Sequence, residues 1–143
     1  MQRSGSISRG ALMDDVRNRK YRILVVDDDA SQVELSKRML EREGFVVESA
    51  LSAIGVTNIV RSFAPHVVLL DVQIPALSGD RLLLLVRKNA PAATKLVLFS
   101  ACDEEHLRSL AREVQADDWI SKSWDLDRVA RRLFQLCAAD ARS

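Results

Sequence analysis

The sequence predicts an α/β fold in which five parallel strands form one sheet and five helices cover its two faces. Short apolar runs alternate with segments whose apolar residues recur at helical spacing, which is the pattern of strand–helix units. The apolar runs are nearly continuous, as in strands that are buried on both faces of a parallel sheet. The predicted strands are YRILVV (21–26), FVVESA (45–50), HVVLL (66–70), KLVLFS (95–100) and DDWIS (117–121).

The first two helices are predicted at residues 31–43 and 52–63. Asp29 stands just before the first of them and is typical of an N-cap, while Gly44 ends it. Pro65 closes the second helix. The apolar face of the first helix is predicted to contain Val33, Leu35, Met39 and Leu40.

Three more helices are predicted in the second half of the chain. The third covers residues 78–89, with Ser78 as its N-cap, and its leucine run at 82–85 is interpreted as core packing. The fourth opens with the acidic run 103–105, because negative side chains stabilise a helix N-terminus. The fifth covers residues 125–139 and places Leu126, Val129, Leu133, Phe134 and Leu136 near one side.

The composition indicates one globular domain. The 143 residues are 48% hydrophobic and 29% charged, and the net charge of +1 favours neither nucleic acid nor a membrane as a partner. There is no run of 18 apolar residues, and the start of the chain lacks the apolar stretch of a secretory signal. Cys102 and Cys137 match no metal-site spacing and are typical of reduced thiols, so we expect a cytoplasmic protein.

The first 20 residues differ in character from the rest. They are rich in arginine, with Gly and Ser near the start, and we interpret them as a basic, flexible extension. Contact of this extension with a partner is the alternative. The domain itself is expected at residues 21–139, with a short tail at 140–143.

Chemically active side chains follow four of the five predicted strands. They are Asp27, Asp28 and Asp29 after the first, Asp71 after the third, Ser100 after the fourth and Lys122 after the fifth. Ligands of open parallel sheets bind beyond the carboxyl ends of the strands, so we expect these side chains to converge. Two carboxylates about 5 Å apart repel by roughly 3 kcal/mol at an effective dielectric near 20. Carboxylates without His or Cys favour Mg²⁺, which would offset this repulsion.

This set of side chains suggests phosphoryl chemistry. An aspartate after a central strand can act as a nucleophile toward phosphorus and form an acyl phosphate. A nearby lysine and hydroxyl would stabilise the phosphoryl oxygens. Each residue also has an ordinary interpretation: Asp29 as a helix cap, Lys122 as a surface lysine and Ser100 as a strand-end serine. Only their combination favours the functional interpretation.

Four motifs together resemble the receiver domain of two-component response regulators, the fold of the chemotaxis response regulator. They are ILVVDDDA (23–30), VVLLDVQIPALSGD (67–80), LVLFSA (96–101) and ADDWISKS (116–123). The resemblance covers residues 21–139 and implies a doubly wound, flavodoxin-like sheet of strand order 2-1-3-4-5. Pro75 and Gly79 match the turn that follows the phosphorylation loop in this family.

The resemblance also implies a phosphorylation site and a metal site. Asp71 would be the phosphoacceptor. Asp28, Asp71 and the backbone carbonyl of Gln73 would ligate Mg²⁺, and Asp27 would act on the metal through a water molecule. Ser100 and Lys122 would occupy the family's hydroxyl and lysine positions.

Three residues depart from the usual pattern of the family. Trp119 stands at the aromatic switch position in place of Tyr or Phe, and Ser100 replaces Thr but keeps the hydroxyl. Ser123 follows Lys122 where the family usually has a cis proline. A cis bond before a residue other than proline costs roughly 2.5–4 kcal/mol, so we predict a trans Lys122–Ser123 bond and a shifted loop.

The function implied by the resemblance is that of a signalling phosphoacceptor, not an enzyme. A histidine kinase or phosphotransfer protein would donate the phosphoryl group to Asp71 in the presence of Mg²⁺. The new charge would draw Ser100 toward it and switch the surface of the fourth helix, fifth strand and fifth helix. A downstream protein or a second copy would bind that surface.

Two other functions are weighed against this one. The alternative is a binding module that keeps the fold without the switch, with Trp119 held in one conformation. An aspartyl-phosphate hydrolase is disfavoured, because Gln73 stands where that class usually has a second acid. No helix-turn-helix segment is left to assign, so we expect a shuttle or relay acting by protein contact, without direct binding of nucleic acid or a membrane.

Overall fold

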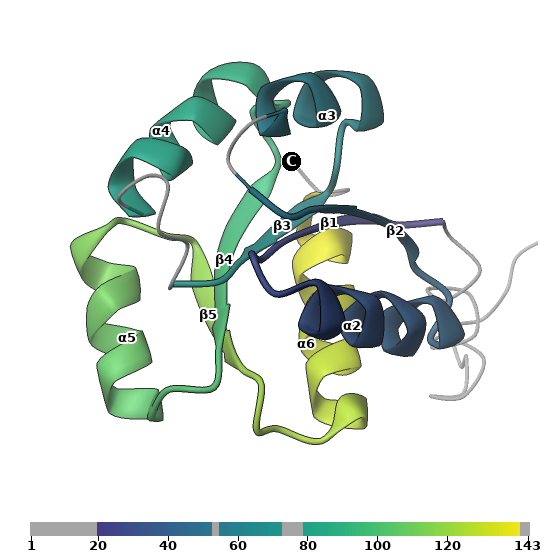
Figure 1. Cartoon of the computed structure of the whole chain (residues 1–143), viewed down its shortest axis with the longest axis vertical. Coiled ribbons are helices and arrows are strands. Elements are labelled where there is room, and N and C mark those ends of the chain that lie inside the picture. Colours follow the sequence, from purple (N-terminus) through teal and green to yellow (C-terminus); the bar gives the residue numbers. More distant parts are fainter. Residues whose placement is uncertain (1–19, 53–54, 73–78, 141–143) are drawn as a thin grey trace, which may run out of the picture.

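Five strands form one parallel sheet of order β2-β1-β3-β4-β5, as predicted (Figure 1). The computed structural model describes residues 20–52, 55–72 and 79–140, so most of the predicted extension and tail lie outside the described residues. Each observed strand lies within one of the predicted apolar runs. The strands are β1 (Arg22–Val26), β2 (Val46–Ala50), β3 (Val67–Leu70), β4 (Lys95–Ser100) and β5 (Asp118–Ser121).

The described residues contain the five predicted helices. The largest difference in bounds concerns α3, which begins at Val56 rather than at residue 52 and follows Gly55, whose φ of 87° is left-handed. Such a φ suits glycine and stops the helix from extending backward. Ser78, the predicted N-cap of α4, lies outside the described residues. The helices are α2 (Ala30–Arg42), α3 (Val56–Phe63), α4 (Gly79–Asn89), α5 (Glu104–Glu113) and α6 (Leu126–Asp140).

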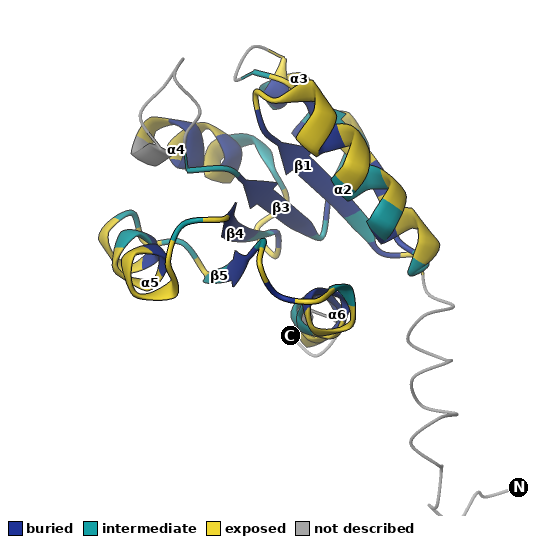
Figure 2. Ribbon diagram, turned by 60° about the horizontal axis from the view of Figure 1, so that its bottom comes forward, coloured by how far each residue is buried: buried dark blue, intermediate teal, exposed yellow. Residues whose placement is uncertain are grey.

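The helices cover the sheet on both faces, α2 and α6 on one and α3, α4 and α5 on the other (Figures 1 and 2). Successive side chains of a strand point to opposite faces, which explains the apolar strand sequences. In β1, Ile23 and Val25 join the core under α6, while Leu24 and Val26 join the core under α3 and α4. The sheet is therefore buried from both sides, and its strand ends are the part left open.

Two details of the predicted helix faces were wrong. Leu35 on α2 is 54% exposed, and in the leucine run of α4 Leu84 is 67% exposed while Leu82 and Leu83 are buried. A helix turns by about 100° per residue, so four consecutive side chains cannot all face the sheet. For the same reason Leu35, two residues after the buried Val33, points to nearly the opposite side of α2.

Among the described residues, no helix is both long enough and apolar enough to cross a membrane.

The difference between buried and exposed leucines can be measured. Leu133 on α6 is fully buried, so Leu133→Ala is expected to lower the free energy of unfolding by about 2–5 kcal/mol. The matched variant Leu84→Ala removes the same atoms from an exposed site and is expected to change it by less than about 0.5 kcal/mol. Urea denaturation measures both, and equal losses would contradict the described core.

Candidate functional site

The register of the sheet brings the predicted site residues together. Val26 and Leu70 are paired across β1 and β3, so Asp27 and Asp71 are the next residues on two neighbouring strands. The pairing continues past the strand ends, because the backbone N–H of Asp71 donates to the carbonyl of Val26 over 3.0 Å. At the other side of the site, the N–H of Lys122 donates to the carbonyl of Ser100 over 2.8 Å.

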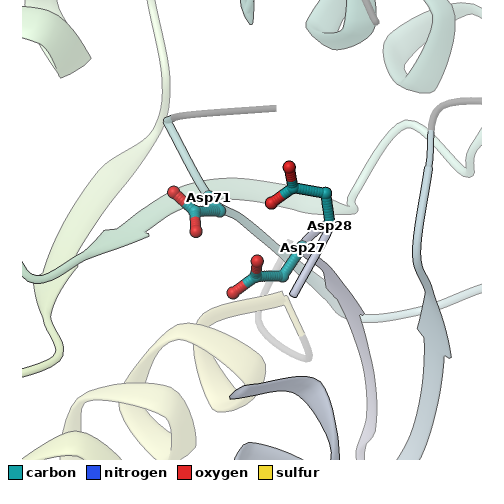
Figure 3. Close-up of side chains that lie close together, drawn as sticks. All are labelled: Asp27, Asp28 and Asp71. Atoms are coloured by element: carbon teal, nitrogen blue, oxygen red, sulfur yellow. The ribbon is translucent and has the colours of Figure 1, made fainter. Parts of the chain in front are cut away.

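Three carboxylates form a cluster at this edge of the sheet (Figure 3). Asp27, Asp28 and Asp71 each offer one oxygen, and these oxygens all lie within 4.8 Å of one another. Asp27 and Asp28 come from the end of β1 and Asp71 from the end of β3, with the side chain of Asp28 pointing toward Asp71. Asp27 is buried, Asp71 is half-buried and Asp28 is exposed, so the cluster is open on the side of Asp28.

The ammonium of Lys122 lies between two of these carboxylates. Its Nζ is 2.8 Å from Oδ2 of Asp27 and 3.4 Å from Oδ2 of Asp71, and only 15% of its side chain is exposed. The same Nζ lies 5.4 Å from the ring centroid of Phe99, on β4. A positive charge supplied by the chain itself therefore offsets part of the carboxylate repulsion.

Asp27 is held as a carboxylate by its neighbours. Burial raises its pKa, but hydrogen bonds from Lys122 and from the backbone N–H of Asp29, the charge of Lys122 and a contact with Asp71 outweigh burial. The result is a pKa of Asp27 below its ordinary value of 3.8. Its two oxygens have separate partners: Oδ1 accepts from Asp29 N–H over 3.0 Å and Oδ2 accepts from Lys122.

Asp29 caps α2, which confirms the ordinary interpretation of this residue. Its Oδ1 accepts hydrogen bonds from the backbone N–H groups of Ser31 at 2.9 Å and Gln32 at 3.2 Å. The three consecutive aspartates thus have three different environments: one buried against a lysine, one exposed in the cluster and one at a helix end.

A pocket of about 490 Å³ opens over the cluster. This volume is within the range of small-ligand sites. Ser100 is 4% exposed, and its Oγ accepts a hydrogen bond from the N–H of Cys102 over 3.3 Å. Gln32, Ala101 and Cys102 also line the pocket, although no sequence pattern assigns them to it. Ala101 and Cys102 directly follow Ser100, and Gln32 lies in the first turn of α2. The pocket is lined by Asp27, Asp28, Asp29, Gln32, Asp71, Ser100, Ala101, Cys102 and Lys122.

Trp119 lies outside this group, at the edge strand β5. Its half-buried ring is 5.7 Å from the ring of Trp124, centroid to centroid, and the guanidinium carbon of Arg108 lies 5.6 Å from its centroid. Trp124 is in turn fixed by its indole N–H, which donates to Glu104 over 3.0 Å. The ring therefore has neighbours from α5 and from the loop after β5.

One of the remaining predictions about the site is confirmed, and the others are not tested by the described residues. The Lys122–Ser123 peptide bond is trans, as predicted, while the shifted loop stays a prediction. Gln73 and Pro75 lie outside the described residues, and Gly79 is the first residue of α4.

The lowered pKa of Asp27 predicts a pH-dependent contribution to stability. A carboxyl group whose pKa is lowered on folding stabilises the fold above its unfolded pKa, and this contribution is lost as the pH falls through the folded value. In metal-free buffer, the unfolding free energy of the wild type minus that of Asp27→Asn is expected to be larger at neutral pH than below pH 3.8.

Chemical denaturation across this pH range measures the difference. In a Lys122→Met background the same difference is expected to vary less with pH, because the ammonium that lowers the pKa is gone. A difference that grows toward acid pH would contradict the arrangement of Asp27 and Lys122.

Comparison with curated proteins identifies relatives at moderate identity. The chain is 32% identical over 112 residues to the response regulator MprA of Mycobacterium sp. (strain KMS), a match covering 78% of this chain and 48% of that protein. It is 30% identical over 120 residues to the alkaline phosphatase synthesis transcriptional regulatory protein SphR of Synechococcus elongatus, covering 78% and 46%. The chain thus spans about half the length of these relatives.

Solved structures show the same fold. A CheY-like response regulator receiver domain protein from Methanospirillum hungatei JF-1 superposes with a TM-score of 0.73 at 24% identity, covering 86% of this chain and 98% of that one. The chemotaxis response regulator CheY4 of Vibrio cholerae gives 0.70 at 19% identity, covering 82% and 98%. The model of the response regulator receiver domain family matches residues 23–134. The chain therefore belongs to the receiver domain family of two-component response regulators.

Proposed function

We propose that this receiver accepts a phosphoryl group on Asp71 with the help of Mg²⁺ and thereby switches a protein-interaction surface. The observation that carries the proposal is the convergence of three carboxylates, Lys122 and the hydroxyl of Ser100 on one open pocket. The chain acts as a phosphoacceptor rather than as an enzyme on a separate substrate.

The donor set of the pocket fits Mg²⁺. One oxygen from each of the three carboxylates lies within 4.8 Å of the other two, and the cluster contains no His or Cys. Asp28 is exposed and Asp71 half-buried, so two of the acids are accessible to an ion. Asp28 and Asp71 would hold the ion directly, together with the backbone carbonyl of Gln73, and Asp27 would act through water. Bound there, Mg²⁺ supplies positive charge that screens the oxygens of an incoming phosphoryl group.

The side chains of this chain then have distinct roles in the transfer. An oxygen of Asp71 attacks the phosphorus atom, a new P–O bond forms and the bond to the donor's leaving group breaks. Lys122, already 3.4 Å from Asp71, can pair with a phosphoryl oxygen, while Asp27 keeps the ammonium in place. Ser100 lines the same pocket, and its hydroxyl donates a hydrogen bond to another phosphoryl oxygen.

The partners follow from this chemistry. A histidine kinase or a phosphotransfer protein in the cytoplasm supplies the phosphoryl group. The surface formed by α5, β5 and α6 then binds a downstream protein or a second copy. This surface adjoins the pocket, because α5 begins two residues after Cys102 and β5 ends just before Lys122. The movement of Ser100 toward the phosphoryl group is the local event that biases this surface.

Phosphorylation can be tested with a small phosphodonor and Mg²⁺. The wild type is expected to gain the mass of one phosphoryl group, and Asp71→Asn is expected to gain none, because the amide lacks the nucleophilic oxygen. Asp103→Asn makes the same chemical change at the N-cap of α5 and serves as the matched control. Intact-protein mass spectrometry measures the gain.

Two results would count against the proposal: a wild type that stays unmodified, or an Asp71→Asn variant that is modified as fast as the control.

The second candidate function is a binding module without a switch. The observation that favours it is the packing of Trp119, whose ring lies next to Arg108 and Trp124. In this case the surface around β5 binds its partner with or without phosphorylation.

Trp119 itself can decide between the two functions. In a Trp124→Phe variant it is the one remaining tryptophan, because the sequence contains only two. Adding a beryllofluoride phosphate mimic with Mg²⁺ is expected to change its emission, since switching alters the surroundings of the ring. Trp119→Phe is the matched control and reports Trp124 alone. Unchanged emission of Trp119 on a protein that binds the mimic would favour the constitutive module.

A further inference from the structure

The position of Lys122 depends on the loop that carries it. Lys122 is the first residue after β5, whereas Asp71 follows β3, and β4 lies between these two strands. Its side chain therefore reaches over β4, above the ring of Phe99, to meet its carboxylate partners. A change in the backbone at Lys122 would move the ammonium away from both acids.

The two neighbours of Lys122 are joined by their side chains. Oγ of Ser121 lies 2.6 Å from Oγ of Ser123, and it also accepts the backbone N–H of Ser123 over 3.1 Å. We call this pair the serine clasp. Ser121 is fully buried, and its backbone carbonyl accepts the N–H of Trp124 over 3.2 Å. The clasp thus closes a tight turn with Lys122 at its centre.

A hydroxyl that bonds the backbone two residues further on forms a turn in place of a backbone hydrogen bond. Here Lys122 is the residue inside the turn, between Ser121 and Ser123. Its own backbone N–H donates to the carbonyl of Ser100 on the neighbouring strand β4. Ser121 Oγ is also a buried polar atom whose two described partners both belong to Ser123. Ser123 lacks the ring by which a proline would fix its own φ angle, so at this position the two contacts with Ser121 restrain the backbone instead.

From this geometry we infer that the serine clasp positions Lys122 for phosphoryl transfer, which makes Ser121 and Ser123 positioning residues of the site. The inference rests on the proposed function for its catalytic consequence. The placement of the ammonium beside Asp27 is a separate consequence, which can be observed without any phosphoryl group.

The first test observes the ammonium of Lys122 by nitrogen–proton NMR. In the wild type this group is expected to give a signal protected from solvent exchange, because it is hydrogen-bonded to Asp27 and only 15% exposed. Ser121→Ala is expected to lose the signal and Ser121→Thr, which keeps the hydroxyl, to retain it. Ser62→Ala, the same change on α3 at an exposed site, is the matched control.

A wild type without this signal, or a Ser121→Ala protein that keeps it, would overturn the inference. If Ser121→Ala does not fold, Ser123→Ala takes its place, because Ser123 is exposed and its loss removes only one of the two clasp contacts. That variant is expected to show a weaker, faster-exchanging signal, and an unchanged one would overturn the inference as well.

The second test measures the rate of phosphorylation by a small donor. Ser121→Ala is expected to slow phosphorylation on the order of tenfold, because a displaced Lys122 would make about one hydrogen bond fewer to the transition state. The apparent Mg²⁺ affinity is expected not to fall, because the carboxylates are untouched and a positive charge moves away from them. In a Lys122→Ala background, Ser121→Ala is expected to have no further effect.

An equal slowing in the Lys122→Ala background would show a general structural role and overturn the inference. A wild type that accepts no phosphoryl group would instead refute the proposed function, and the NMR result would still decide whether the clasp positions Lys122.

Discussion

The contact of the Lys122 ammonium with Asp27 and Asp71 is the interaction on which the arrangement of this site depends. Three acids converge at the end of a parallel sheet, and their mutual repulsion would disfavour that convergence without a positive charge among them. Lys122 supplies that charge from within the chain, at 2.8 Å and 3.4 Å from two of the carboxylates. The same contact keeps Asp27 ionised, so the cluster retains a negative charge that attracts a cation from solution.

The parallel sheet makes this contact possible. Because β1, β3, β4 and β5 run in the same direction, residues distant in sequence arrive at one edge of the sheet. Asp27 and Asp71 are at the same level there, and Ser100 and Lys122 follow one and two residues further along. The two apolar cores fix the strands, so the positions of Asp27 and Asp71 follow from packing that has no chemical role of its own. The apolar side chains in the middle of the sheet thus stabilise the fold, and the polar side chains at the strand ends form the site.

Much of this architecture could be predicted from the sequence. The three central strands β1, β3 and β4 are nearly continuous apolar runs, so their positions and burial follow directly. The strand ends then indicate which polar side chains meet. The exposure of Leu84 could not be predicted, because four consecutive leucines do not indicate which side of the helix faces the sheet. The contact of Lys122 with the buried Asp27 and the role of Ser121 depend on the path of a loop, which no local pattern fixes. Cys102 enters the pocket from the loop between β4 and α5 for the same reason, whereas Gln32 enters it from the first turn of α2.

Trp119 has an unusual place in the packing. The sheet separates the two apolar cores of the molecule, yet this side chain, on the edge strand, packs against both of them. A change in its orientation would disturb the two layers of helices at once, whereas a change within α3 or α6 would stay on its own side. A structural change at the end of β5 that moves Trp119 would therefore alter side-chain packing on both faces of the sheet.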